Sequence, residues 1–73
     1  MRDVEINKQP VELYKVLKFE GLAQSGAAAK IMIDDGQVKV NGTVETQRRK
    51  KILDGDTIEF NGETLNIIAP TSP

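Results

Sequence analysis

The sequence predicts an α+β fold, in which two short adjacent helices pack on a small, mostly antiparallel β-sheet. Two observations lead to this fold class. Between residues 11 and 36, apolar side chains recur at helical spacing in two runs, and each run ends at a glycine. Outside this segment apolar and polar residues alternate, and two Asn-Gly pairs mark tight hairpins. Because 73 residues have room for one small core, residues 1–73 are expected to form a single domain.

The N-terminal segment predicts a short strand followed by the first helix. Residues 3–7 alternate polar and apolar side chains, which is the period of a half-buried strand. Pro10 is expected in the first turn of the helix, where its missing N–H breaks no hydrogen bond. Gly21 supplies the left-handed residue that ends such a helix, and Leu22 can fold back on the last turn. The apolar positions of the strand and the helix are Val4, Ile6, Leu13, Val16 and Leu17.

The second helix is predicted between Ser25 and Gly36. Ser25 is a good N-cap, and Gly36 is expected to end the helix as Gly21 ends the first. The alanines at 27–29 favour a helix, and their small side chains allow another helix or a ligand to come close to the backbone. The stripe expected to be buried is Ala29, Met32 and Ile33.

The remaining strands follow from a change to period two. Asn41-Gly42 is expected to form a tight hairpin turn, and Asn61-Gly62 reverses the chain again. Residues 54–56 have the composition of a turn, and residues 70–73 are expected to form a frayed end. The apolar residues predicted to alternate along these strands are Val38, Val40, Val44, Ile58, Phe60, Leu65 and Ile67.

The composition argues against an enzyme. There is no cysteine and no histidine, which removes disulfides, thiolate nucleophiles, the common zinc sites and the usual proton shuttle, so no metal ion and no cofactor is expected. Ser25 has no histidine to activate it. The acid pairs Asp34-Asp35 and Asp54/Asp56 are interpreted as a helix end and a turn. With no signal-like or membrane-spanning apolar run, a cytoplasmic protein without a membrane partner is expected.

Charge is unevenly distributed along the chain. The formal net charge is −1, yet residues 15–51 carry +4 and residues 52–73 carry −4. The run "TQRRKK" at 46–51 contains four adjacent cations. Such a run can be a solvated surface loop, or it can bind phosphates. Phosphate binding gains support from the further cations of the same segment, because a local basic patch attracts nucleic acid despite a negative total.

The aromatic content narrows the kind of nucleic acid. Tyr14, Phe19 and Phe60 are the three aromatic residues, too few for a base-stacking platform of the single-strand-binding type. Tyr14 is expected in core or boundary packing, with stacking on a base as the alternative. Recognition of folded RNA through its shape and backbone fits this composition better.

The order of motifs resembles a known family. The stretch "LYKVLKFEGLAQSGAAAKIMIDDGQVKVNG", followed by the basic loop and "GDTIEF", is similar to the RNA-binding domain first defined in ribosomal small-subunit protein four, also called the αL RNA-binding motif. The resemblance covers about residues 11–60 and is to the small free-standing bacterial members. It implies an L-shaped RNA-binding surface made by two helices and the following hairpin.

The resemblance assigns RNA-facing roles residue by residue. Many members begin the first helix with Arg-Leu-Asp, where this chain has Glu12, Leu13 and Tyr14, and many place Arg after the serine, where this chain has Gly26. Those two cationic contacts are therefore not transferred. The cations that the resemblance implies to face RNA are Lys15, Lys18, Lys30 and Lys39, with the loop residues Arg48, Arg49, Lys50 and Lys51 as the main anchor.

Gly26 suggests one further contact. With Ser25 as the cap and small residues after it, a phosphate could lie at the start of the second helix, where a bulky side chain would obstruct it. On this hypothesis Gly26→Val weakens RNA binding without unfolding the domain.

The sequence thus predicts a monomeric, non-catalytic protein that binds structured RNA, either ribosomal or transfer RNA. Ribosomal or RNA-processing proteins are the expected protein partners. The alternative is a protein-interaction adaptor whose polarised charge docks an acidic partner. The salt dependence of binding separates the two, because displaced phosphate counterions give a steep slope.

Overall fold

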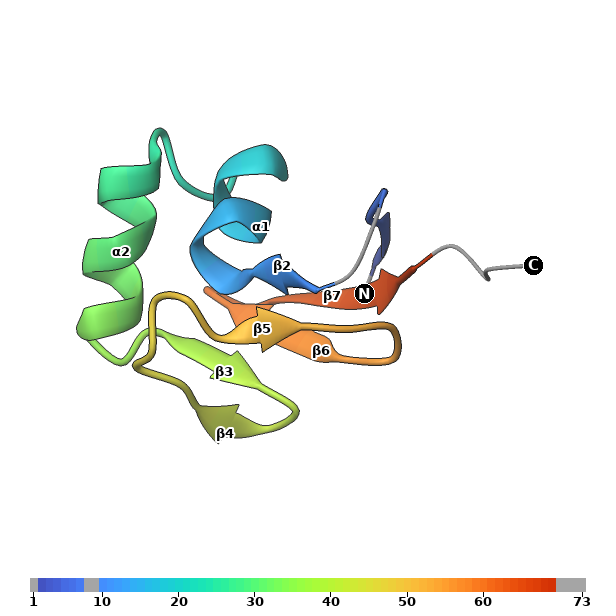
Figure 1. The fold of residues 1–73 in the computed structure, drawn as a ribbon. Coiled ribbons are helices and arrows are strands. Elements are labelled where there is room, and N and C mark those ends of the chain that lie inside the picture. The colour runs from blue at the N-terminus through green and yellow to red at the C-terminus, as the bar shows by residue number, and fades with distance from the viewer. Residues whose placement is uncertain (1, 8–9, 70–73) are drawn as a thin grey trace.

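Two helices lie above a small sheet in the computed structural model, which describes residues 2–7 and 10–69 (Figure 1). The elements are β1 (Arg2–Glu5), β2 (Val11–Glu12), α1 (Leu13–Phe19), α2 (Gly26–Asp34), β3 (Val38–Val40), β4 (Thr43–Val44), β5 (Lys51–Ile52), β6 (Thr57–Phe60) and β7 (Glu63–Ile68). The main sheet has the order β1-β7-β6-β3-β4. Its β1–β7 pair is parallel and its other pairs are antiparallel, so the predicted α+β fold class is confirmed.

The start of the first helix differs from the prediction. Pro10 does not lie in the first turn, because Val11 and Glu12 form the short strand β2 and the helix begins at Leu13. Val11 pairs with Ile52 and Glu12 pairs with Lys51, so β2 and β5 form a separate two-stranded sheet. An extended partner from a distant part of the chain therefore overrides the local preference of proline for a helix start.

Both helices end as predicted. Gly21 (φ 76°) follows α1 and Gly36 (φ 78°) follows α2, and each adopts the left-handed conformation. The N–H of Leu22 donates to Leu17 O at 3.0 Å, and the N–H of Gln37 donates to Met32 O at 3.2 Å. These bonds satisfy carbonyl groups that the helix itself leaves free, which is the Schellman arrangement.

The hairpin after α2 has the predicted turn and an unpredicted register. Asn41 (φ 53°) and Gly42 (φ 83°) are both left-handed, as a tight two-residue turn requires. The turn pairs Val40 with Thr43 and Lys39 with Val44. Val44 therefore shares a face with Lys39 and is 50% exposed, so the alternation predicted for Val38, Val40 and Val44 does not continue across the turn.

One apolar core joins the helices to the strands. Leu13 and Leu17 of α1 and Ile33 of α2 are fully buried against residues of β3, β5, β6 and β7. The buried strand residues include Val38, Val40, Ile52, Ile58, Leu65 and Ile67. The expected frayed end, residues 70–73, lies outside the described residues. Within the described ranges no helix is long and apolar enough to cross a membrane.

Candidate nucleic-acid interface

The basic loop, residues 46–51, lies across the beginning of α1. The N–H of Leu13 donates to Lys50 O at 2.9 Å, and the N–H of Tyr14 donates to Arg48 O at 3.2 Å. Glu12, the residue before the helix, makes no side-chain capping bond. The loop backbone thus accepts hydrogen bonds that the first turn of a helix cannot make internally. The loop is fixed against α1 by its carbonyl groups, and its side chains are left for other contacts.

A second contact fixes the loop to the end of α2. The Arg48 Nε donates to both oxygens of Asp34, at 2.9 Å and 3.0 Å, and its Nη2 also bonds Asp34 Oδ2. Asp34 is the last residue of α2. A guanidinium that meets a carboxylate through two nitrogens is held in orientation as well as in place. In Figure 1 the loop accordingly passes from β4 beside the lower end of α2 before it enters β5.

This contact changes the acidity of Asp34. The hydrogen bond from Arg48 lowers the pKa of the Asp34 carboxyl below its ordinary value, partial desolvation opposes this, and attraction to the guanidinium charge adds to it. A group whose pKa is lower in the folded state stabilises the fold above its unfolded pKa, which is about 3.9 for aspartate. That stabilisation is lost as the pH falls through the folded pKa.

We therefore expect the Asp34→Asn variant to differ from the wild type in its pH dependence. The melting temperature of the wild type should fall more steeply than that of the variant between about pH 5 and pH 2.5, because only the wild type loses the ionised Asp34. Thermal unfolding followed by circular dichroism across this range measures the difference. Parallel curves for the two proteins would mean that the contact does not contribute to folding.

The side chain of Tyr14 on α1 lies beside the start of α2 and beside two of the predicted lysines. The Lys30 Nζ is 4.7 Å from the centre of the Tyr14 ring, and the Lys15 Nζ is 6.0 Å from it. Tyr14 is half-buried and packs against the core, so the packing interpretation is confirmed. A Cβ at Gly26 would lie 3.5 Å from Tyr14 Cε2, an ordinary contact distance. Tyr14 therefore brings the lysine of α1, the lysine of α2 and the start of α2 to one place.

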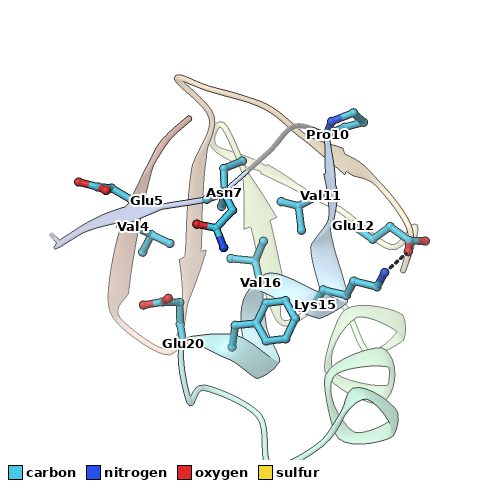
Figure 2. Close-up of a pocket in the computed structure, with 11 residues that line it drawn as sticks. Val4, Glu5, Asn7, Pro10, Val11, Glu12, Lys15, Val16 and Glu20 are labelled. Atoms are coloured by element: carbon cyan, nitrogen blue, oxygen red, sulfur yellow. Dashed lines mark ion pairs between the residues drawn. The ribbon is translucent and has the colours of Figure 1, made fainter. Parts of the chain in front are cut away.

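Glu12 connects α1 to the basic loop through two cations. Its Oε1 lies 3.2 Å from the Lys15 Nζ, drawn as a dashed line in Figure 2, and its Oε2 lies 3.5 Å from the Arg49 Nε. Sequence reasoning noted Glu12 only as a departure from the family pattern. Its position three residues before Lys15, on a predicted helix, could have indicated the ion pair between the two side chains. Its proximity to Arg49 could not be seen in the sequence.

These contacts define one surface, which we call the helix–loop cluster. Its members are Glu12, Tyr14, Lys15, Lys30, Arg48 and Arg49. Lys18 lies one turn after Tyr14 on α1 and is exposed, with its Nζ 6.0 Å from the centre of the Phe19 ring. Lys50 is half-buried. Lys51 is exposed but belongs to the short strand β5 rather than to an irregular loop.

Of the remaining predicted site residues, Lys39 lies on the sheet, whereas Ser25 and Gly26 lie at the start of α2. Lys39 pairs with Glu59 and Val44 and lies between the buried residues Val38 and Val40, so it points away from the core on the outer face of the sheet. It is therefore not brought together with the helix–loop cluster. Ser25 Oγ accepts from the N–H of Ala28 at 3.1 Å, which confirms Ser25 as the N-cap of α2. Gly26 is the first residue of that helix.

The two acid pairs have the structural roles that the sequence predicted. Asp34 holds Arg48, and Asp35 accepts from Gln37 Nε2 at 2.9 Å beyond the helix end. Asp56 accepts from the N–H of Leu53 at 2.8 Å, and Asp54 accepts from the N–H of Ala69 at 2.9 Å. The part of the chain that the structure describes contains no group of three His, Cys, Asp or Glu residues that could hold a metal ion.

A pocket of about 580 Å³ lies beside α1, next to β1 and β2 (Figure 2). Its lining mixes apolar side chains with charged ones: Val4, Glu5, Ile6, Asn7, Pro10, Val11, Glu12, Lys15, Val16, Phe19 and Glu20. Phe19 is 68% exposed. Glu12 and Lys15 belong to the helix–loop cluster and also line this pocket, so the two surfaces are adjacent.

Comparisons with known proteins agree with the fold. The Escherichia coli (strain K12) protein named "Putative RNA-binding protein YbcJ" is 49% identical over 70 residues, which cover 94% of this chain and 100% of that protein. The Bacillus subtilis (strain 168) protein named "Probable ribosome maturation protein RlbA" is 30% identical over 59 residues, covering 81% and 83% of the two chains. The solution structure of E. coli YbcJ, described as revealing an αL motif involved in RNA-binding, matches with a TM-score of 0.70 and 48% identity over 92% of this chain and 86% of that one.

The family assignment rests on these matches together with the observed fold. The family model described as the S4 domain matches residues 4–68, which is nearly the whole chain. The resemblance noted in the sequence is thereby confirmed, and so is its αL architecture of two short helices and a following hairpin. This chain belongs to the S4-domain family.

Proposed function

We propose that this protein binds structured RNA, as a single domain and without catalysing a reaction, through the helix–loop cluster and the neighbouring Lys18, Lys50 and Lys51. One observation carries the proposal: the backbone of the basic loop is hydrogen-bonded to the start of α1, and Arg49 of the loop and Lys15 of α1 contact the same Glu12 carboxylate. The relative named as a putative RNA-binding protein supports it. Recognition would act mainly on phosphates, because cations that replace the counterions of a nucleic acid provide most of such affinity.

Ribosomal RNA is the proposed target, with transfer RNA as the alternative. The relative named as a probable ribosome maturation protein supports the first choice. In such a setting the protein would act as a cytoplasmic monomer and would meet ribosomal or RNA-processing proteins on the same RNA. A-form RNA presents its phosphates and 2′-hydroxyl groups across a wide, shallow groove, and a rigid basic surface can match that shape without reading bases.

Arg48 and Arg49 can still bind phosphate although each already pairs with an acidic side chain. Arg48 meets Asp34 through Nε and Nη2, and a guanidinium has five N–H donors, so donors remain for a phosphate. Arg49 is more exposed, with 74% of its side chain accessible. The start of α2 at Ser25 and Gly26 is included as a secondary phosphate contact, and Gly26→Ala is a milder test of it than Gly26→Val, because larger side chains would press on Tyr14.

Nuclear magnetic resonance titration with fragments of ribosomal RNA tests this proposal. We expect the largest shifts of backbone amide signals at residues 12–15, 30 and 48–51. A matched pair of variants sharpens the test: Lys30→Met should weaken binding by roughly three- to ten-fold, whereas Lys39→Met, on the outer face of the sheet, should have a smaller effect. The opposite ranking, or shifts confined to the outer face, would contradict the proposed surface.

The protein-adaptor alternative also has a specific observation in its favour. The pocket beside α1 is lined in part by apolar side chains, and one of them, Phe19, is largely exposed. Exposed apolar surface of this kind is more often found where proteins bind one another than on an inert surface. Binding of a cellular partner that persists at high salt and after loss of the loop cations would favour the adaptor function.

A further inference from the structure

The contacts of Glu12 differ from those of Asp34, the acid that pairs with Arg48 of the helix–loop cluster. Glu12 meets two cations from two different elements, Lys15 of α1 at 3.2 Å and Arg49 of the basic loop at 3.5 Å. The two cations contact different carboxylate oxygens, Oε1 and Oε2. Asp34, by contrast, is held by the single residue Arg48 through several bonds. Glu12 therefore lies where two cations from different elements converge on one carboxylate, as they would on an external anion.

We propose that Lys15 and Arg49 form a binding site for one RNA phosphate, and that the Glu12 carboxylate occupies this site in the free protein and leaves it when RNA binds. This inference rests on the proposed function and adds to it a particular site and an internal competitor. A phosphate, like a carboxylate, offers two oxygens on one side, and both an ammonium and a guanidinium bind either group. Glu12 thus resembles the ligand in both charge and geometry.

Exchange of the two anions requires that the internal pairs be weak, and the structure meets this condition. The accessible fractions of the side chains are 44% for Lys15, 74% for Arg49 and 30% for Glu12. Each exposed ion pair changes an equilibrium by at most about five-fold, because water and salt screen it. The Arg49 contact, at 3.5 Å from Nε, is also longer than a strong charged hydrogen bond. An RNA phosphate supported by neighbouring contacts can therefore displace the carboxylate.

Removal of the Glu12 carboxylate by Glu12→Gln should leave the fold intact. Its side chain does not cap α1, and its backbone pairs with Lys51 through main-chain groups that glutamine retains. The N–H groups of Leu13 and Tyr14 donate to loop carbonyls, which are also unaffected. Glu12→Gln is thus a nearly isosteric change that removes only the competing charge.

A matched control separates this specific effect from a general loss of negative charge. Glu45 precedes the basic loop, its Oε2 accepts from the N–H of Gln47 at 3.1 Å, and the described residues include no cation in an ion pair with it. Glu45→Gln removes the same charge near the same loop without opening a site between two cations. The comparison of Glu12→Gln with Glu45→Gln therefore measures the competition itself.

The experiment measures binding of fluorescently labelled ribosomal RNA fragments to the wild type and both variants at several salt concentrations. We expect Glu12→Gln to bind about three- to ten-fold more tightly with a steeper salt slope, and Glu45→Gln to change affinity by less than about two-fold. Lys15→Met should cost more affinity in the Glu12→Gln background than in the wild type, because Lys15 is then fully available. Equal effects of the two glutamine variants, weaker binding by Glu12→Gln, or a smaller cost of Lys15→Met in that background would each overturn the inference.

A second probe keeps this inference separate from the proposed function. Titration with inorganic tripolyphosphate, followed through the Arg49 Nε–H resonance, requires no RNA. The signal should respond at lower tripolyphosphate concentration in Glu12→Gln than in the wild type or in Glu45→Gln. Failure of the wild type to bind ribosomal RNA would count against the proposed function alone, whereas identical tripolyphosphate responses in all three proteins would count against the phosphate site.

Discussion

Replacement of Arg48, Arg49, Lys50 and Lys51 together by alanine is expected to lower the affinity for structured RNA by on the order of 100-fold at low salt, because each lost phosphate contact removes the release of nearly one counterion. The fold should persist, since the loop accepts the hydrogen bonds of Leu13 and Tyr14 with backbone carbonyls that alanine retains. Binding isotherms with labelled ribosomal RNA fragments measure the effect, after circular dichroism has established that the variant is folded.

The salt dependence gives this prediction its sharper form. A plot of the logarithm of the binding constant against the logarithm of the salt concentration should become shallower by roughly three for the four-residue variant. A three-residue variant that keeps Arg48, and with it the contact to Asp34, is the control for structural damage and should show most of the same effect. Unchanged affinity and an unchanged salt slope would mean that residues 48–51 form a solvated surface loop, and would favour the protein-adaptor function.

Ile52→Ala is expected to destabilise the protein by about 2–5 kcal/mol, the usual cost of removing a fully buried isoleucine side chain beyond its β-carbon. Ile52 has no exposed surface and directly follows the basic run. It pairs with Val11, so it anchors both the end of the loop and the strand that precedes α1. A domain of this length has a total stability of roughly 4–11 kcal/mol, so the loss is a large part of the whole.

The neighbouring residue provides the control. Leu53 is 46% exposed, and Leu53→Ala should cost less than about 1 kcal/mol, because little apolar surface leaves the interior. Urea unfolding of the two variants and the wild type measures both values. A cost for Ile52→Ala no greater than that for Leu53→Ala would show that the β2–β5 pair is not part of the cooperative core.

Local features of this protein were predictable because they depend on neighbouring residues. The glycines at 21 and 36, the serine cap at 25 and the two Asn-Gly turns each impose a backbone conformation within a few residues. The apolar periods separated helices from strands for the same reason. Together with the family resemblance, these signals were sufficient for the fold class and for most of the core.

The errors occurred where a distant partner decides the structure. Pro10 was expected in a helix, but pairing with β5 makes the residues after it extended. The apolar alternation was expected to run from Val38 through Val44, but the two-residue turn sets Val44 opposite Lys39. In the second case the alternation of side chains depends on register, and a shift of one residue moves a side chain to the other face.

For the candidate site, too, some properties follow from the sequence and others only from the tertiary structure. The sequence by itself determined which cations the protein has, that four of them are adjacent, and that they lie in a small α+β domain of the S4 type. Only the tertiary structure decided that Lys15, Lys30, Arg48 and Arg49 form one surface around Glu12 and Tyr14, and that Lys39 lies apart from it. The physical reason is that charges act through distance in space, and the distances between α1, α2 and the loop are set by the packing of the core and by the backbone hydrogen bonds of the loop.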